Sequence, residues 1–179
     1  MNFFESDWLY SQIVVMKGIF RNLSFLFLFY ALIPAGISGQ AFDRIKVMEL
    51  DSILNNQENK LYVINLWASW CAPCVSELPV FENTSVDYDT SKVTFVLVSL
   101  DFPSQIEYQL IPFLKKNNIT LDVLVMMDLD YNSWINKIDS GWQGTIPATL
   151  LFNNTSKQRY FHSGEISESE LRRQIDRLM

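Results

Sequence analysis

Both cysteines of this 179-residue chain lie in one short stretch, NLWASWCAPCVSELP, at residues 65–79. Cys71 and Cys74 are separated by two residues, and Trp70 directly precedes the first of them. Two cysteines are too few for a disulfide scaffold, and a single C-x-x-C pair lacks the second pair of ligands that a structural zinc site needs. The pattern therefore indicates thiol–disulfide exchange, unless the pair is simply two buried, inert thiols.

The cysteine pair lies where an apolar run, LYVINLW, gives way to a helical pattern. A thiolate at a helix N-terminus faces unpaired backbone N–H groups and the positive end of the helix dipole, which favour the ionised form of Cys71. Cys74 falls one turn further along the same side, where it can attack a mixed disulfide at Cys71. Pro73 is tolerated because N–H groups in the first turn lack helical partners anyway. We predict that Cys71 is the nucleophile and Cys74 the resolving thiol.

Glu77 follows Cys74 by three residues, so the two are neighbours on a helix. Cys74 must lose a proton before it attacks, and a partly desolvated carboxylate of raised pKa could accept that proton. An ordinary solvated helix charge is the alternative. The chain has one histidine, His162, which leaves little material for a His-ligated metal site or a Ser–His–Asp triad. We therefore expect no metal and no organic cofactor, with the Cys71–Cys74 pair as the redox group.

Three tryptophans lie near the candidate chemistry. Trp70 is expected to lie against the thiol and to offer an apolar contact to partners, whereas Trp67 is expected in the core. Trp142 either lines the edge of the same site or packs internally.

Apolar runs alternate with helical patterns from about residue 41 onward, which predicts a single α/β domain built as a layered sandwich. The expected strands are Arg44–Met48, Leu61–Trp67, Val93–Leu100, Leu121–Met126, Ala148–Asn153 and Gln158–His162. The expected helices are Leu50–Asn56, Cys71–Asn83, Ser104–Asn117, Tyr131–Ile138 and Glu168–Leu178. Ser167 and Glu170 form a capping-box pattern at the start of the last helix.

Residues 1–40 are expected to be an N-terminal extension and a signal peptide, with the folded domain spanning residues 41–179. From Met16, the expected true start, two basic residues precede a short apolar run and then small residues, which is the order of a secretory signal peptide. Residues 23–37 could alternatively serve as an uncleaved membrane anchor if the bilayer thins or the helix tilts. Both readings predict an exported, periplasmic or otherwise extracytoplasmic protein, where disulfides persist.

The formal net charge is −6 and the sequence pI is about 4.7. An acidic chain lacks the basic surface that nucleic-acid binding needs, so we expect no nucleic-acid partner.

The string VINLWASWCAPCVSELP resembles the active-site stretch of the TlpA/ResA-like thiol–disulfide oxidoreductases, a family of the thioredoxin superfamily. The resemblance continues through GTIPATLLFN and a segment ending in HSGEIS, and so covers the whole expected domain. It implies a thioredoxin-like three-layer sandwich with a mixed central β-sheet flanked by helices. Ala72 departs from the residues common in that slot, which leaves the direction of electron flow open.

The resemblance also assigns roles to residues. It implies a cis peptide bond between Ile146 and Pro147 beside the disulfide, with the backbone of Ile146 pairing with an extended substrate segment. It implicates Glu77 in the proton transfer. Asn65 stands where thioredoxins carry a buried aspartate, and because it cannot titrate we expect it to be a structural amide at the strand edge.

We therefore interpret the chain as an exported enzyme that reduces protein disulfides by dithiol–disulfide exchange, with apocytochrome CxxCH disulfides among its candidate substrates. The resemblance implies protein disulfide or dithiol substrates and a membrane or exported thiol reductant as electron donor. A disulfide-forming oxidase on the same fold, a peroxiredoxin-like peroxidase and a redox-silent client-binding module are the alternatives. The peroxidase is disfavoured because Trp70-Cys71 is a thioredoxin feature. Client, donor and oligomeric state are left open.

Overall fold

The computed structural model describes residues 42–56 and 58–179. The expected signal peptide and extension, with Met16 and the possible anchor at residues 23–37, lie outside the described residues. The strands are β1 Phe42–Ile45, β2 Leu61–Trp67, β3 Val93–Ser99, β4 Asp122–Met126, β5 Ala148–Asn153 and β6 Arg159–Ser163. The α-helices are α2 Val47–Asn55, α3 Ala72–Ser85, α4 Ile111–Lys116, α5 Ile135–Ile138 and α6 Glu168–Leu178. Shorter helical segments are η1 Pro103–Gln105, η2 Ile106–Leu110 and η3 Tyr131–Ser133.

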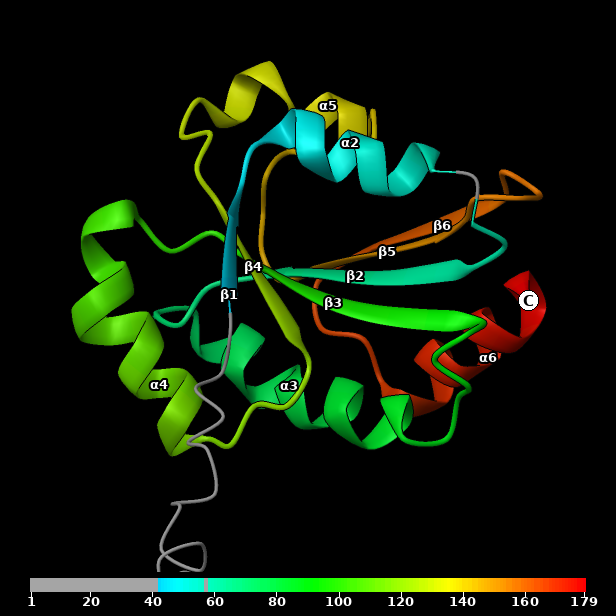
Figure 1. Cartoon of the computed structure of the whole chain (residues 1–179), viewed down its shortest axis with the longest axis horizontal. Coiled ribbons are helices and arrows are strands. Elements are labelled where there is room, and N and C mark those ends of the chain that lie inside the picture. Colours follow the sequence, from blue (N-terminus) through cyan, green and yellow to red (C-terminus); the bar gives the residue numbers. More distant parts are fainter. Residues whose placement is uncertain (1–41, 57) are drawn as a thin grey trace, which may run out of the picture. The chain divides into compact units, whose positions relative to one another are not determined.

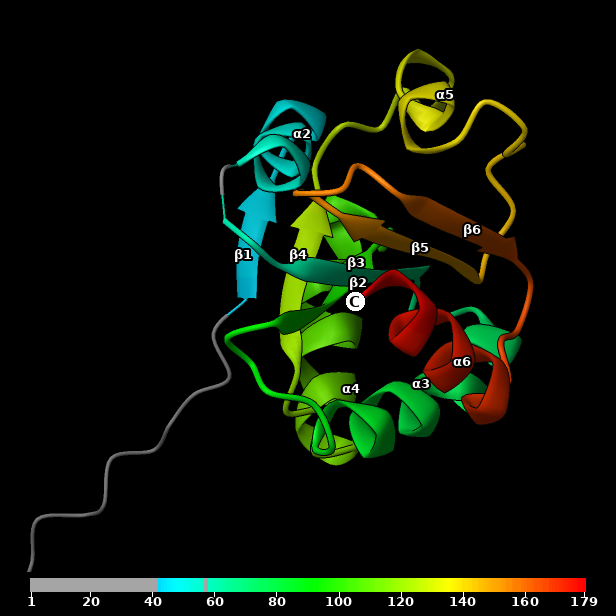
Figure 2. The same ribbon diagram turned by 90° about the vertical axis from the view of Figure 1, so that its right-hand side faces the viewer.

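The six strands form one mixed sheet in the order β1-β4-β3-β2-β5-β6. The first four of these are mutually parallel, whereas β5 runs antiparallel to β2 and β6 antiparallel to β5. The sheet is the middle layer, with α2 and α5 on one face and α3, α4 and α6 on the other (Figures 1 and 2). The three-layer α/β sandwich expected from the sequence is confirmed.

Strand β2 is the centre of this sheet, and all seven of its residues are buried. It pairs in parallel with β3 and antiparallel with β5, so both of its edges are occupied. Alternate side chains enter the two cores on opposite faces, Val63 toward the α3 side and Ile64 toward the α2 side. This burial explains the nearly continuous apolar run that precedes the cysteines. Strand β2 is therefore a rigid support that positions residues 68–71 at its carboxyl-terminal end.

Two expected helices are each divided. The segment expected as Ser104–Asn117 consists of η1, the π-helical η2 and then α4. Pro112 occupies the first turn of α4 and has no N–H to give to the preceding turn, which explains why the regular helix begins only there. The segment expected as Tyr131–Ile138 is interrupted at Trp134, whose φ is −138°. The Trp134 side chain is fully buried and its indole Nε1 donates to the carbonyl of Asp128 at 3.0 Å, and this anchoring holds the residue away from helical geometry.

The first strand and helix begin earlier than the sequence indicated. β1 ends at Ile45 rather than Met48, and α2 starts at Val47 rather than Leu50. Glu49 accepts from the backbone N–H of Lys46 at 2.7 Å, and Asp128 accepts from the N–H of Val47 at 2.8 Å. These carboxylates satisfy two amides at the helix start, which the apolar pattern alone does not reveal. β2, β5 and α6 have the expected bounds, and β3, β4 and β6 differ from them by one residue at one end or at both.

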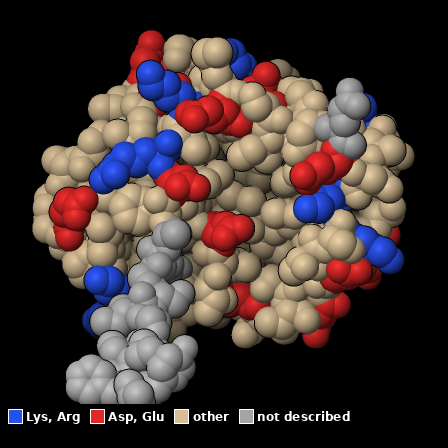
Figure 3. Space-filling view, in the orientation of Figure 1, with Lys and Arg blue, Asp and Glu red and all other residues tan. Residues whose placement is uncertain are grey.

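Charged side chains of both signs are interspersed on the face shown in Figure 3, so no single-sign field covers that face. Within residues 42–56 and 58–179, no helix combines the length and the apolar character needed to cross a membrane.

Candidate active site

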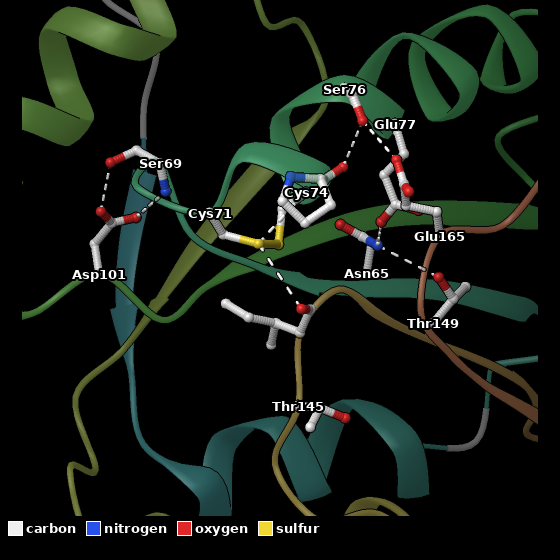
Figure 4. Close-up of a disulfide and its surroundings, with 12 residues drawn as sticks. Asn65, Ser69, Cys71, Cys74, Ser76, Glu77, Asp101, Thr145, Thr149 and Glu165 are labelled. Atoms are coloured by element: carbon white, nitrogen blue, oxygen red, sulfur yellow. Dashed lines mark hydrogen bonds between the residues drawn. A yellow bond between two sulfur atoms is a disulfide. The ribbon is translucent and has the colours of Figure 1, made fainter.

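Cys71 and Cys74 form a disulfide at the point where β2 has ended and α3 begins (Figure 4). Cys71 is the N-cap of α3, with an extended backbone, and its Sγ accepts from the N–H of Cys74 at 3.3 Å. Pro73 lies in the first turn, and no acidic residue lies there. The positive end of the helix therefore faces the sulfur of Cys71 without a competing carboxylate in that turn.

The two sulfurs differ in access to solvent. Cys71 is 7% exposed, whereas Cys74 is completely buried. A partner can therefore reach the disulfide only from the side of Cys71. The order of roles expected from the sequence, with Cys71 as the attacking group and Cys74 behind it, stays a prediction.

The loop before β5 also lies against the disulfide. The Ile146–Pro147 peptide bond is cis, and the carbonyl oxygen of Ile146 lies 3.8 Å from Sγ of Cys71. Gly164 donates its N–H to the carbonyl of Pro147 at 2.8 Å, which ties this loop to the end of β6. The structure thus brings Cys71, with Trp70 directly before it, next to Ile146. Cys71 and Ile146 are 75 residues apart in the sequence.

Glu77 is buried on α3, only 3% exposed, and points toward β2. Its Oε1 accepts from Asn65 Nδ2 at 2.8 Å, and its Oε2 accepts from the backbone N–H of Ile166 at 3.0 Å. Burial raises the pKa of the Glu77 carboxyl above its ordinary value, and the two hydrogen bonds act in the opposite direction. Of the two sequence readings for Glu77, the solvated helix charge is wrong, because the side chain faces the core beside Cys74.

Asn65 corrects a second expectation. It is not at a strand edge but in the middle of β2, fully buried, where it also donates to Thr149 Oγ1 at 3.3 Å. Its Oδ1 atom has no hydrogen-bond partner among the described residues. The amide therefore links Glu77 on the helix to β5 across the central strand, and retains one unused acceptor.

A second set of polar side chains, formed by Ser76, His162 and Glu165, extends from the neighbourhood of Glu77 to the surface. Ser76 Oγ donates to Glu165 Oε1 at 2.6 Å, and the imidazole Nε2 of His162 lies 3.0 Å from the carbonyl oxygen of Glu165. Glu165 raises the pKa of Glu77 and His162 lowers it, each by a smaller amount than burial raises it. The described residues show no hydrogen bond between His162 and either sulfur; its ring nitrogens lie near Tyr160 Oη and the carbonyl oxygen of Glu165.

Asp101, which the sequence analysis missed, holds the turn before the cysteines. It is fully buried and accepts from the backbone N–H of Ser69 at 2.9 Å, from Ser69 Oγ at 2.5 Å and from Ser99 Oγ at 2.7 Å. Figure 4 shows this pair on one side of the disulfide and Asn65, Glu77 and Glu165 on the other. An available signal was overlooked: Asp101 follows β3, Ser69 follows β2, and the ends of adjacent parallel strands meet at one edge of the sheet.

The tryptophans separate as expected in two cases. Trp70 is 49% exposed beside Cys71, and Trp67 is fully buried in the core. Trp142 is almost completely buried, and its indole Nε1 donates to the carbonyl of Thr145 at 2.8 Å. Among residues 42–56 and 58–179, no cluster of three or more His, Cys, Asp or Glu side chains could hold a metal ion.

Comparison with known proteins places this site in a family. The sequence profile of the AhpC/TSA family matches residues 41–160, which is more than half of the chain. The chain belongs to the AhpC/TSA family. The chain is also similar to the thiol–disulfide oxidoreductase ResA of Halalkalibacterium halodurans, 24% identical over 165 residues that cover 90% of this chain and 88% of the relative.

Other similar proteins have names of the same kind. The sporulation thiol–disulfide oxidoreductase A of Bacillus subtilis is 23% identical over 72% of this chain and 74% of its own length. Among solved structures, a thioredoxin-related protein from Neisseria meningitidis superposes with a TM-score of 0.60 at 22% identity, covering 70% of this chain and 89% of the other. StoA of B. subtilis gives a TM-score of 0.51 at 22% identity, over 65% and 83% respectively. The thioredoxin-like fold and the TlpA/ResA-like resemblance are confirmed.

The AhpC/TSA member described here is therefore a thiol–disulfide oxidoreductase of the thioredoxin superfamily, with the Cys71–Cys74 disulfide as its redox group. Enzymes of this class act on disulfides or dithiols of proteins.

Proposed function

We propose that this protein is exported and reduces protein disulfides outside the cytoplasm, with Cys71 as nucleophile and Cys74 as resolving thiol. The observation that carries the proposal is the asymmetry of the pair. Cys71 caps α3 and is the accessible sulfur, next to the Ile146 carbonyl, whereas Cys74 is completely buried one turn behind it. This arrangement suits an attack from outside followed by an internal displacement.

The reaction balances as two displacements. In the dithiol form, the Cys71 thiolate attacks one sulfur of a substrate disulfide, a Cys71–substrate bond forms, and the other substrate sulfur leaves as a thiolate. The Cys74 thiolate then attacks Cys71 Sγ, the enzyme disulfide forms, and the second substrate sulfur leaves. Two electrons pass to the substrate. The disulfide form is the one described here, and a membrane-bound or exported thiol reductant must return two electrons before the next cycle.

Glu77 is proposed as the acceptor of the Cys74 proton. The two residues are three apart on α3 and both are buried, so water cannot easily take this proton. A carboxyl whose pKa is raised by burial binds a proton more tightly than an ordinary carboxyl does, which makes it a better acceptor for the Cys74 proton. Asn65 and the Ile166 N–H hold the carboxyl in place through the hydrogen bonds to its two oxygens.

Substrate is proposed to dock as an extended segment along Ile146 and Pro147, with Trp70 beside it. Among the described residues, the backbone N–H of Ile146 has no hydrogen-bond partner, and its carbonyl oxygen contacts only the sulfur of Cys71. Both backbone groups are therefore available for strand-like pairing with a polypeptide. Such pairing would bring a substrate cysteine to Cys71.

Separate features support the proposed direction of electron flow and the proposed location. Ala72-Pro73 between the cysteines resembles the Gly-Pro of reductants more than the Pro-His of oxidants, which favours reduction. Export is proposed from the leader pattern before residue 41, with residues 23–37 as a possible anchor. CxxCH disulfides of apocytochromes are included among the proposed substrates on the strength of the family resemblance alone.

The decisive experiment is the reduction potential of the Cys71–Cys74 pair, measured by equilibration with glutathione and dithiothreitol buffers, together with insulin-disulfide reduction. A potential near or below that of thioredoxin, ~−270 mV, supports a reductase. A value near ~−120 mV would instead make the protein a disulfide donor. Cys71→Ala is the control and should abolish insulin reduction. If the wild type shows no exchange but binds unfolded clients, the redox-silent binding module replaces the enzyme. The mature N-terminus, determined by mass, tests cleavage of residues 1–40.

A further inference from the structure

A small pocket opens beside the disulfide and takes no part in the exchange described so far. It has a volume of about 190 Å³ and is formed by residues from four separate segments. Besides Gly144, the pocket is lined by Trp70, Leu100, Phe102, Tyr131, Trp142 and Ile146. Two of these, Trp70 and Phe102, are 49% and 46% exposed, so the apolar lining is open to solvent beside the disulfide.

The side chains that line the pocket offer carbon surface and almost no hydrogen-bonding capacity. The indole N–H of Trp142 is used internally, by the carbonyl of Thr145 at 2.8 Å. The hydroxyl of Tyr131 is directed to the carbonyl of Leu100 at 3.4 Å. No charged side chain is among the lining residues. A polar or ionic ligand would lose its hydration here without replacement, so the occupant must be apolar.

The size of the pocket selects a single side chain. A cavity of ~150 Å³ lined by apolar residues accommodates benzene, whereas pockets for drug-sized molecules have at least ~300 Å³. At about 190 Å³ this pocket fits one aromatic or large aliphatic side chain and is too small for a dinucleotide or flavin.

The pocket is continuous with the reactive site. Trp70 directly precedes Cys71, and the carbonyl oxygen of Ile146 lies 3.8 Å from Cys71 Sγ. A polypeptide whose cysteine is joined to Cys71 must therefore place the residues next to that cysteine against Trp70 and Ile146. Those two residues form one side of the pocket, so one of the neighbouring substrate side chains lies at its mouth.

We propose that this pocket is a specificity subsite that receives a large apolar side chain of the polypeptide substrate, close in sequence to the substrate cysteine. The inference rests on the proposed function, because it requires a mixed disulfide at Cys71. It makes the preferred substrates disulfides flanked by Phe, Leu or a similar residue rather than by Ser or Asp. Phe102, which is not next to a cysteine in sequence, becomes a residue that determines substrate choice.

The test uses Cys74→Ser protein in full length, reduced, and short peptides whose single cysteine carries thionitrobenzoate. Attack by Cys71 joins the peptide to the protein and releases coloured thionitrobenzoate, the better leaving group. The peptides carry Phe, Leu, Ser or Asp at each of the two positions on either side of the cysteine. We expect the second-order rate constant to be about tenfold higher for the best Phe or Leu peptide than for its Ser counterpart, equivalent to ~1.4 kcal/mol.

Two substitutions in the Cys74→Ser background locate the effect. Phe102→Asp places a charge at the mouth of the pocket and should bring the Phe/Ser rate ratio close to one. Tyr108→Asp is the matched control, since Tyr108 is 68% exposed and does not line the pocket, and it should keep the ratio. Thermal melting establishes that each variant is folded, and Phe102→Ser serves if the charged variant is not.

A ratio near one in the Cys74→Ser parent would overturn the proposal, and so would an unchanged ratio in a folded Phe102 variant. Reaction with 2-hydroxyethyl disulfide, which has no apolar side chain, distinguishes failure of the subsite proposal from failure of the proposed function. If the parent does not react with it at all, Cys71 is not a nucleophile, and the proposed function falls together with the subsite.

Discussion

Replacing Glu77 with Gln should change how the stability of the oxidised protein depends on pH. Glu77 is 3% exposed, and its burial raises the pKa of the carboxyl in the folded state. The folded protein thus holds this proton more tightly than the unfolded chain does. The stabilisation that results is fully present below the pKa of the unfolded chain and is lost as the pH rises through the raised folded pKa. Gln cannot titrate, so Glu77→Gln lacks this dependence.

The slope of the effect follows from linkage. Between the ordinary carboxyl pKa of 4.5 and the raised folded value, the wild type loses up to ~1.4 kcal/mol of unfolding free energy per pH unit relative to Glu77→Gln. Above the folded pKa the difference is constant. Below pH 4.5 the wild-type carboxyl is protonated in both states, and the two proteins should be about equally stable.

The substitution is compatible with the surrounding hydrogen bonds. The Gln carbonyl can still accept from the Ile166 N–H, and its NH₂ group can donate to Oδ1 of Asn65, which lacks a partner, if the Asn65 amide rotates. Glu77→Ala has no such compensation. It leaves the buried N–H of Ile166 without an acceptor, which should lower the free energy of unfolding by about 1–3 kcal/mol relative to Glu77→Gln at every pH.

The assay is urea-induced unfolding of oxidised protein from pH 4 to pH 8, with both cysteines in the disulfide so that neither titrates. The difference in unfolding free energy between wild type and Glu77→Gln should grow with pH, to the disadvantage of the wild type. Parallel curves over that range, or a wild type that loses stability relative to Gln on acidification, would refute the raised pKa. The proposed proton transfer from Cys74 would then lose its physical basis.

Three further outcomes are expected. Cys74→Ser should accumulate a covalent adduct with a protein substrate, visible on a non-reducing gel and absent when Cys71 is also replaced; equal accumulation in the wild type would contradict the resolving role. Asp101→Ala leaves the N–H of Ser69 without its acceptor and should lower the free energy of unfolding by about 1–3 kcal/mol, so an unchanged denaturation midpoint would show that this contact is unimportant. Ser167→Ala removes the side chain that caps α6 by accepting from the N–H of Glu170, and it should lower the free energy of unfolding by about 0.5–2 kcal/mol in thermal or urea unfolding. Ser167→Asp keeps a capping oxygen and should lower it little. Equal losses in the two variants would argue against capping.

The features that the sequence predicted well are those encoded by short periods and local spacing. β2 and β5 have the expected bounds because continuous apolar runs bounded by polar residues identify strands buried on both faces. α6 begins and ends as expected because a capping serine and a helical apolar stripe define it locally. The cysteine pair could be placed at a helix start for the same reason.

The features that the sequence did not predict depend on contacts between distant segments. The bond from Asp101 to Ser69 joins residues 32 apart in the chain, at the ends of two neighbouring strands. The burial of Glu77 depends on Asn65 and on the loop containing Ile166, neither of which its own helix pattern reveals. The break at Trp134 likewise arises from a tertiary anchor, the carbonyl of Asp128. Local propensity carries no information about these long-range contacts, so only the assembled fold decides them.

The complete burial of Cys74 has a consequence for the lifetime of the covalent intermediate. Its Cα lies 5.2 Å from that of Cys71, so the second displacement is intramolecular and benefits from a very high effective concentration. Free thiols in the surroundings cannot reach Cys74. The internal displacement by Cys74 should therefore outpace attack of external thiols on the mixed disulfide at Cys71, so a change in the external thiol pool mainly alters how often the enzyme is recharged.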